Sequence, residues 1–222
     1  MEIFLDTANI DEIKEILEWG MIKGVTTNQK IFLKEKGCNF EEQAKKILKM
    51  VNPLPVSLEG PNSFDELIEN ARMYNKWGKN VVIKVPMLAN GDGIRAVKVL
   101  ASEGIKTNVT AMMNLNQAFL AITAGATYAS LFFNRIRDHG DNPVEIIKQV
   151  KTAIEEGGYK TKIIVGSIRN PEDVAEIITT NAHIVTIPYK ILKKMPYHEK
   201  TVSTLEEFEK AWEEFKSAEK IC

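Results

Sequence analysis

Short apolar runs alternate with longer amphipathic segments along the whole chain. The runs are rich in β-branched residues, which is typical of strands buried on both faces of a parallel sheet. Eight of them occur, at residues 2–6, 24–28, 55–59, 81–86, 105–110, 127–133, 162–167 and 183–188. The segments between them carry apolar residues at helical spacing, so the pattern predicts eight strand–helix units.

Helix-start signals precede several of the helical segments. The spacing of a capping box, a polar cap followed three residues later by Glu or Gln, occurs at Asn9 and Glu12, Ser63 and Glu66, and Asn114 and Gln117. Asparagine stands directly before proline, a favoured first helical residue, at Asn142-Pro143 and Asn170-Pro171. Helices are therefore predicted to begin at these positions.

The number of units fits a single (β/α)8 barrel, the TIM barrel of the α/β class, in a chain of 222 residues. A doubly wound open sheet is the alternative, but the sequence has neither a GxGxxG fingerprint nor a P-loop. No linker, low-complexity tract or break in composition divides the chain. Residues 1–222 are therefore predicted to form one domain.

A ninth helical pattern, at about 203–218, follows the eight units. Ser203 and Glu206 have capping-box spacing there, and an apolar stripe consists of Leu205, Phe208, Trp212 and Phe215. The stripe is expected either to pack on its own barrel or to dock on a neighbouring subunit, because the eight-unit count is complete without it.

The composition of the chain narrows the classes of binding partner and the cellular compartment that we expect. A formal net charge of −1 gives no basic footprint for nucleic acid and no attraction to an anionic membrane. No apolar stretch reaches membrane-span length and no signal peptide is evident, so we expect a cytoplasmic protein. Cys38 and Cys222 are too few for a disulfide framework or a zinc site. The polar run 138–142 has turn chemistry without a metal-ligand spacing, so no metal is expected.

Lys84 lies inside an apolar run, 81–87, that predicts a buried strand. An ammonium group buried there is costly, so the side chain is expected to become a neutral amine or to find a partner. A neutral amine attacks a carbonyl to form a Schiff base. The structural alternatives are a lysine whose head group reaches solvent at the strand end, or an ion pair with Glu59.

Polar residues gather at the ends of the predicted strands, where barrels of this type carry their chemistry. The set is Asp6, Thr26, Thr27, Asn28, Glu59, Lys84, Asn108, Thr110, Ser130, Arg135, Ser167 and Arg169. A lysine forms imines, carboxylates move protons, amides and hydroxyls hold polyols, and arginine forks suit phosphate. The pattern predicts a Schiff-base enzyme, without metal or cofactor, that acts on a phosphorylated hydroxy-carbonyl compound.

Six stretches carry a resemblance over nearly the whole chain. They are 3–9 (IFLDTAN), 24–28 (GVTTN), 82–87 (VIKVPM), 103–110 (EGIKTNVT), 124–128 (AGATY) and 167–171 (SIRNP). In residues and separations they resemble the small-subunit transaldolases and the similar fructose-6-phosphate aldolases. The resemblance implies a (β/α)8 barrel, class I Schiff-base chemistry in the non-oxidative pentose phosphate pathway, and a homopentamer or decamer.

The resemblance also implies residue roles. Lys84 is similar to the Schiff-base lysine, and Asp6 to the group that takes the proton from the C4 hydroxyl. Glu59 is similar to the carboxylate that moves protons through a water held by Thr110. The implied substrate-binding positions are Thr26, Asn28, Asn108, Ser130, Phe132, Arg135, Ser167 and Arg169, of which the last three match the family's phosphate-binding groups.

Two positions distinguish the activities within the family. Glu59 stands where the aldolases carry glutamine, and Phe132 where they carry tyrosine, so both favour transaldolase. The chain departs from the family pattern at Gln29-Lys30, where proline and a small hydroxyl residue usually follow Asn28. Further departures are at Gly60-Pro61, Leu131 and residues 112–114.

Three functions stay open. The first is transfer of a dihydroxyacetone unit from sedoheptulose 7-phosphate or fructose 6-phosphate to an aldose phosphate. The second is an aldolase that releases free dihydroxyacetone. The third is a barrel that binds a sugar phosphate without turning it over, since a fold alone does not decide function.

Overall fold

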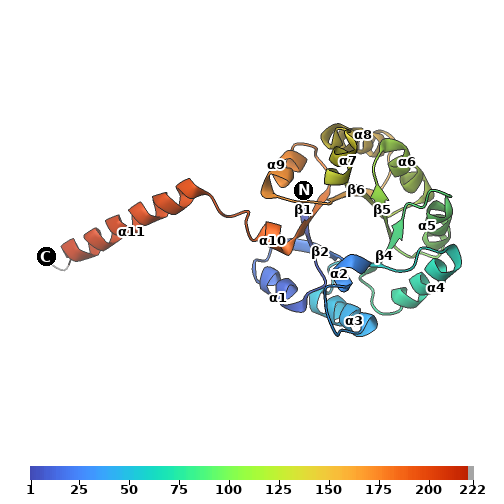
Figure 1. Cartoon of the computed structure of the whole chain (residues 1–222), viewed down its shortest axis with the longest axis horizontal. Coiled ribbons are helices and arrows are strands. Elements are labelled where there is room, and N and C mark those ends of the chain that lie inside the picture. Colours follow the sequence, from blue (N-terminus) through green and yellow to red (C-terminus); the bar gives the residue numbers. More distant parts are fainter. Residues whose placement is uncertain (220–222) are drawn as a thin grey trace.

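The strands of the chain close into one parallel barrel. A computed structural model describes residues 1–219, and in it the strands follow sequence order from β1 to β8, with β8 paired to β1 (Figure 1). Their bounds are Glu2–Asp6 (β1), Ile22–Thr26 (β2), Val56–Glu59 (β3), Val81–Pro86 (β4), Thr107–Met112 (β5), Tyr128–Phe132 (β6), Lys162–Gly166 (β7) and Ile184–Pro188 (β8). The predicted (β/α)8 barrel is confirmed.

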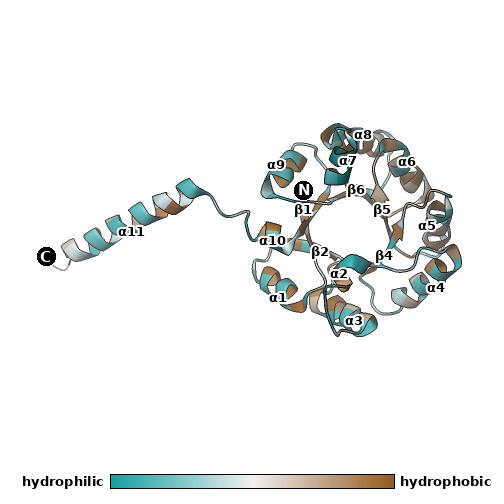
Figure 2. Cartoon of the chain, viewed as in Figure 1, coloured by the Kyte–Doolittle hydropathy of each residue, from teal (hydrophilic) through white to brown (hydrophobic). Residues whose placement is uncertain are grey.

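Amphipathic helices surround this barrel. Their bounds are Ile10–Glu18 (α1), Gln29–Phe32 (α2), Phe40–Val51 (α3), Phe64–Asn75 (α4), Asp92–Ser102 (α5), Leu115–Ala124 (α6), Phe133–His139 (α7), Pro143–Glu156 (α8), Pro171–Ile178 (α9) and Tyr189–Leu192 (α10). A further helix, Glu199–Glu219 (α11), follows them at the C-terminal side. Strand residues such as Leu5, Val85 and Val165 belong to the core that these helices cover. Figure 2 shows the helices of the ring as mixtures of hydrophobic and hydrophilic residues, as expected of a layer between core and solvent.

Five predicted helix starts are confirmed. The N-cap residues of α1, α4, α6, α8 and α9 are Asn9, Ser63, Asn114, Asn142 and Asn170. The four asparagine side chains accept backbone N–H groups, whereas the Ser63 hydroxyl donates to the Glu66 carboxylate instead. A complete capping box forms at Asn170, where Asp173 takes the place of the Glu or Gln in the sequence signature.

Two strands are displaced from their predicted bounds. β2 ends at Thr26 because Asn28 already caps α2, accepting the Ile31 N–H at 3.0 Å. β5 runs from Thr107 to Met112, two residues later than predicted at both ends. Side chains alternate along an extended chain wherever the bounds are drawn, so these displacements leave the inward-facing positions unchanged.

The inside of the barrel has an apolar layer beneath a polar one. The apolar layer consists of Phe4, Tyr128, Ile164 and Ile184, which pack together from four different strands. Side chains two residues apart on a strand share a face. The next positions toward the C-terminal ends are Asp6, Ser130, Gly166 and Thr186, so polar groups lie above a closed apolar floor.

The C-terminal helix lies apart from the barrel. α11 begins at Glu199, four residues before the predicted start, and the Lys200 N–H donates to Nδ1 of His198. Ser203 therefore lies inside the helix and does not cap it. Figure 1 shows α11 projecting away from the ring, and none of residues 199–219 is buried. None of the helices within residues 1–219 is long and apolar enough to cross a membrane.

The apolar stripe of α11 is open to solvent in the single chain. Its members are between 52% and 64% exposed: Leu205, Phe208, Trp212 and Phe215. The interpretation in which this stripe packs on its own barrel is therefore wrong.

Candidate active site

A cavity of about 150 Å³ lies at the C-terminal end of the barrel. Nearly every strand, or the loop that follows it, contributes to its lining, which consists of Asp6, Thr26, Asn28, Lys84, Asn108, Thr110, Ser130, Phe132, Arg135, Gly166, Ser167 and Thr186. Of the polar residues predicted at the strand ends, Thr27, Glu59 and Arg169 do not line it. One chain thus brings an amine, a carboxyl group, hydroxyls, amides and a guanidinium group together.

Lys84 is buried within β4, with 5% of the residue exposed. Its Nζ donates to the Thr27 carbonyl at 3.0 Å and lies 3.6 Å from Oε2 of Glu59. Glu59 is paired with Lys84 across β3 and β4, and paired residues on neighbouring strands hold their side chains within reach. The amine therefore has the partner that burial requires and still lines the cavity, so the alternative in which it reaches solvent is wrong.

Asp6 is the carboxyl group of the cavity itself. The Thr26 hydroxyl donates to its Oδ1 at 2.7 Å, and the hydroxyl oxygens of Thr26 and Thr186 are 2.5 Å apart. Since Thr26 uses its only hydrogen on Asp6, Thr186 donates to Thr26. Burial raises the pKa of Asp6, while the charge of Lys84 and the Thr26 hydrogen bond act against that rise. A carboxylate with a raised pKa is a stronger proton acceptor.

Glu59 is the second carboxyl group beside Lys84. Burial raises its pKa, and Lys84 together with the amide group of Gln29 acts in the opposite direction. In the cavity itself, the hydroxyl of Thr110 is buried and has no hydrogen-bond partner among the described residues. A buried hydroxyl that faces a polar cavity is a place where a water molecule or a ligand hydroxyl binds.

Two amide side chains of the cavity are fixed in orientation. The Ser130 hydroxyl donates to Oδ1 of Asn108 at 2.7 Å, and Nδ2 of Asn108 donates to Oγ of Ser57 at 3.1 Å. Asn28 uses its Oδ1 to cap α2, which leaves its NH2 group as the part able to donate to a ligand. These groups can hold the hydroxyls of a small polyol.

The predicted phosphate-binding groups are only partly brought together. Arg135 and Ser167 both line the cavity. Ser167 has a φ of 63°, a left-handed conformation that is uncommon without glycine, and its carbonyl accepts from Nδ2 of Asn134 at 2.9 Å. Arg169 instead forms an exposed ion pair with Asp138, and this pairing lowers the pKa of the Asp138 carboxyl.

Thr186 and Ser57 belong to the site but were not predicted from the sequence. Thr186 lines the cavity and holds Thr26, and Ser57 holds Asn108. The alternation of side chains along each strand contained the signal for both residues. Thr186 shares a face with Ile184 inside the barrel, and Ser57 shares a face with Glu59.

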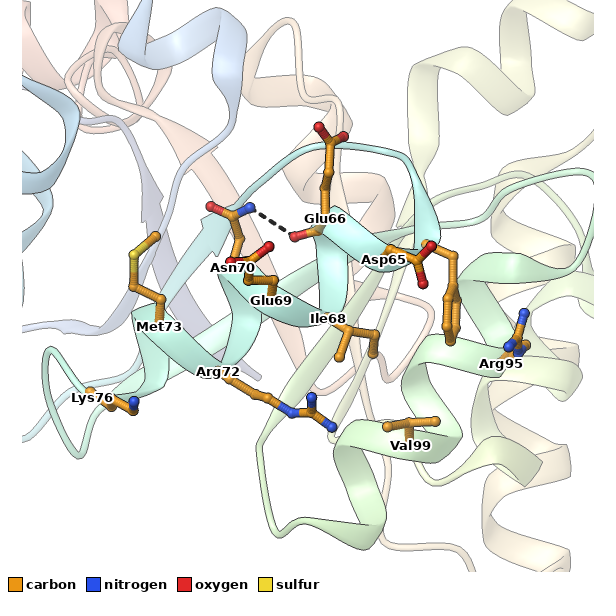
Figure 3. A pocket seen from close by; sticks show the side chains of 11 residues that line it. Asp65, Glu66, Ile68, Glu69, Asn70, Arg72, Met73, Lys76, Arg95 and Val99 are labelled. Carbon is orange, nitrogen blue, oxygen red and sulfur yellow. Dashed lines mark hydrogen bonds between the residues drawn. The ribbon is translucent and has the colours of Figure 1, made fainter.

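A larger hollow of about 910 Å³ lies on the outer helical layer, between α4 and α5 (Figure 3). Its only lysine, Lys76, is exposed, Arg72 pairs with Glu103, and the guanidinium carbon of Arg95 lies 3.8 Å from the Phe64 ring centroid. This hollow lacks a buried reactive group, so the smaller cavity is the candidate active site. Within residues 1–219, no three His, Cys, Asp or Glu side chains are placed to hold a metal ion.

Comparison with known proteins finds similar sequences over almost the whole chain. The chain matches the family model for transaldolase/fructose-6-phosphate aldolase over residues 3–221. A probable transaldolase of Caldicellulosiruptor saccharolyticus is 46% identical over 215 residues, which cover 96% of this chain and 97% of the relative. Probable transaldolases of Petrotoga mobilis and Thermoplasma acidophilum are each 42% identical, over 97% and 96% of this chain and 96% and 95% of the relatives. The chain belongs to the transaldolase/fructose-6-phosphate aldolase family.

Proposed function

We propose that the protein is a transaldolase, which moves a dihydroxyacetone unit from a ketose phosphate to an aldose phosphate through a Schiff base on Lys84. The observation that carries the proposal is the buried Lys84 amine, 3.6 Å from Glu59, in a cavity that also contains Asp6. The relatives named as probable transaldolases support the same reaction. Sedoheptulose 7-phosphate and fructose 6-phosphate are the proposed donors, in the non-oxidative pentose phosphate pathway.

Formation of the imine needs an amine and a route for protons. The uncharged Nζ of Lys84 attacks the ketose carbonyl carbon, and the carbinolamine then loses water to give a protonated imine. Glu59 supplies and removes the protons of these steps, through a water bound at the free Thr110 hydroxyl. The raised pKa of Glu59 suits it to both directions of transfer.

Cleavage and transfer follow from the electron sink that the imine provides. Asp6 takes the proton of the C4 hydroxyl while the C3–C4 bond breaks, and the electron pair of that bond moves to the protonated imine. The products are an aldose phosphate and a dihydroxyacetone enamine held on Lys84. The enamine carbon then attacks the carbonyl of the acceptor aldose, Asp6 returns the proton, and hydrolysis of the imine releases the new ketose phosphate.

Arg135 and Ser167 are the proposed ligands of the substrate phosphate, because both line the cavity and arginine suits phosphate. Arg169 can join them only if it leaves Asp138. That ion pair is exposed on both sides, and exposed pairs contribute little to stability, so a phosphate competes well for the guanidinium group.

The aldolase alternative differs in the fate of the enamine. Release of free dihydroxyacetone needs a proton donor near the enamine carbon, and the side chain of Phe132 in the cavity has no exchangeable proton. Retention of the enamine until an acceptor arrives is therefore favoured. The non-catalytic alternative is disfavoured because binding a sugar phosphate requires no buried amine between two carboxyl groups.

Reductive trapping tests the proposal. The protein is incubated with fructose 6-phosphate and borohydride, and the adduct is located by peptide mass spectrometry. A three-carbon adduct on Lys84 is expected, with none in Lys84→Met and an unchanged yield in Lys106→Met, a control at an exposed lysine that precedes β5. Failure to trap any adduct on Lys84 rejects the Schiff-base mechanism.

Acceptor dependence separates the two family activities. Turnover of fructose 6-phosphate is measured with and without an aldose phosphate. A transaldolase consumes the ketose only when the acceptor is present. Steady production of free dihydroxyacetone without acceptor would assign the aldolase activity instead.

A further inference from the structure

Gln29 joins the ends of β2 and β3 at the rim of the cavity. It is the first residue of α2, and its Nε2 donates to the Gly60 carbonyl at 2.7 Å. Its neighbour Asn28 lines the cavity, and Gly60 directly follows Glu59. One side-chain amide thus connects the backbone beside a cavity residue to the backbone beside the second carboxyl group.

This link takes over where the backbone pairing of β2 and β3 ends. The paired residues of these strands stop at Thr26 and Ser57, and the Thr27 N–H adds a last bond to the Ser57 carbonyl at 3.1 Å. Beyond that point, Gln29 is the residue that bonds across to the chain after β3. On its other side Glu59 is held by pairing with Lys84 in β4.

The contacts close into a ring around Glu59. Lys84 donates to the Thr27 carbonyl at 3.0 Å and lies 3.6 Å from Glu59. The chain continues from Glu59 to Gly60, across the 2.7 Å hydrogen bond to Gln29, and back to Thr27. Displacing Gln29 opens this ring at the position next to Glu59.

Glu59 has space to move away if the ring opens. A second cavity of about 440 Å³ adjoins it, lined by Gln29, Phe32, Leu33, Cys38, Phe40, Glu59, Gly60, Pro61 and Tyr74. Most of these side chains are apolar and none is a lysine or an arginine, so the carboxyl group meets no cation there to replace Lys84. Gln29 lines this cavity together with Glu59, and its amide group lowers the pKa of the Glu59 carboxyl.

We infer that Gln29 is a positioning residue, which holds Glu59 beside Lys84 for proton transfer during formation and hydrolysis of the imine. The inference rests on the proposed function for its effect on turnover.

Other charged and titratable groups act on Glu59 as well. Lys84 on β4 lowers its pKa, and Asp6 on β1 raises it. Tyr74 on α4 and Cys38 before α3 line the adjoining cavity. These groups stay the same when Gln29 is replaced, so a change in the titration of Glu59 reports on Gln29.

Three variants are expected to affect the pKa of Glu59 differently. Gln29→Leu removes the donor and with it the link to the Gly60 carbonyl, so it is expected to raise the pKa of Glu59. Gln29→Arg keeps a donor and adds positive charge, so it is expected to lower that pKa. Lys30→Leu introduces the same side chain at the next exposed residue and is expected to leave it unchanged.

The pKa of Glu59 is measured directly by carbon-13 NMR of labelled glutamate, with the signal assigned by its absence in Glu59→Gln. The acidic limb of kcat/KM is expected to move in the same direction as this pKa in each variant, because that profile reports groups of the free enzyme. A pKa that is equal in wild type, Gln29→Leu and Gln29→Arg overturns the inference. So does a loss of turnover that is uniform across pH, since a purely structural role produces that result.

The NMR titration does not depend on catalysis. If no adduct forms on Lys84, the proposed function fails while the titration still decides whether Gln29 acts on Glu59. If the adduct forms and the titration shows no effect, the function stands and the role of Gln29 is rejected.

Discussion

Asp6 and Glu59 share one physical property, which is that burial raises the pKa of both carboxyl groups. For catalysis the rise makes each a better proton carrier near neutral pH. For folding it is unfavourable. The folded chain keeps the proton to a higher pH than the unfolded chain, so the free energy of unfolding falls as pH rises from the ordinary value toward the raised one.

Asp6→Asn separates these two effects. The asparagine retains an oxygen that accepts from Thr26 but cannot ionise. Because the ordinary pKa of Asp6 is 3.8 and the folded value lies above it, the variant is expected to melt at a higher temperature than wild type at pH 7.5, with the difference lost at pH 3. Turnover is expected to fall about 10²- to 10⁴-fold. Thermal melts at both pH values check this, and a lower melting temperature at pH 7.5 would contradict it.

Thr186 acts on Asp6 only through Thr26. Thr186→Val keeps the shape of the side chain and removes the donor, so the Thr26 hydroxyl is free to rotate away from Asp6. We expect kcat to fall about 3- to 10-fold, the value of one hydrogen bond. Thr186→Ser, which restores the hydroxyl, is expected to recover most of the rate. Equal rates in the valine and serine variants would show that the hydroxyl has no part in holding Asp6.

At the scale of elements, the sequence was sufficient to predict strands and helix starts wherever local chemistry decides the structure. The alternation of apolar runs predicted the eight strands, and asparagine caps predicted helix starts such as Asn114 and Asn142. Local signals were insufficient to predict a contact where residues distant in the sequence determine it. The pairing of Arg169 with Asp138 depends on how two separate loops meet, and no spacing in the sequence encodes it.

The candidate site divides in the same way. Residues at strand ends, such as Lys84 and Asp6, were predictable because barrels of this type carry their polar groups there. Supporting residues such as Ser57 and Gln29 were not predictable, because their roles depend on hydrogen bonds to residues that are distant in the sequence. The wrong start of α11 has a local cause, since Ser203 has the spacing of a cap but lies within a helix that begins at Glu199.

The start of α9 is connected to Ser167 through Asn134, whose Nδ2 donates both to the Ser167 carbonyl and to the Asp173 carboxylate. The buried carboxylate of Asp173 accepts from the backbone of Arg169 and Asn170 and from Nδ2 of Asn134, and it pairs with Arg137. Asp173→Ala leaves several of these donors without a partner. We expect a loss of about 3 kcal/mol in the free energy of unfolding by urea denaturation.

The matched control is Glu172→Ala, at an exposed residue in the same helical turn. It is expected to change the free energy of unfolding by less than about 0.5 kcal/mol, as exposed surface positions usually do. Similar losses in the two variants would show that the buried network around Asp173 contributes little.

At the scale of the whole molecule, α11 is the feature that a single chain does not explain. A helix that buries none of its described residues gains little from packing, yet it presents a continuous apolar stripe. Exposed stripes of this kind mark interaction surfaces. We expect a second copy of the chain to cover it in a homo-oligomer.

Phe208→Glu combined with Trp212→Glu tests this expectation. Two charges on the stripe are costly to bury, so the variant is expected to sediment as a smaller species than wild type in analytical ultracentrifugation. Lys210→Glu places the same side chain on the opposite side of α11 and is expected to leave the sedimentation coefficient unchanged. Equal sedimentation coefficients for wild type and the double variant would show that the stripe takes no part in the assembly.

The lining residues of the candidate active-site cavity, by contrast, all come from the barrel of the same chain. We therefore expect chemistry and association to be separable in this fold. In a mixed assembly of wild-type and Lys84→Met chains, each intact chain retains its own amine, carboxyl groups and arginine. Turnover then falls in simple proportion to the fraction of inactive chains, and a defective copy is not dominant over its neighbours.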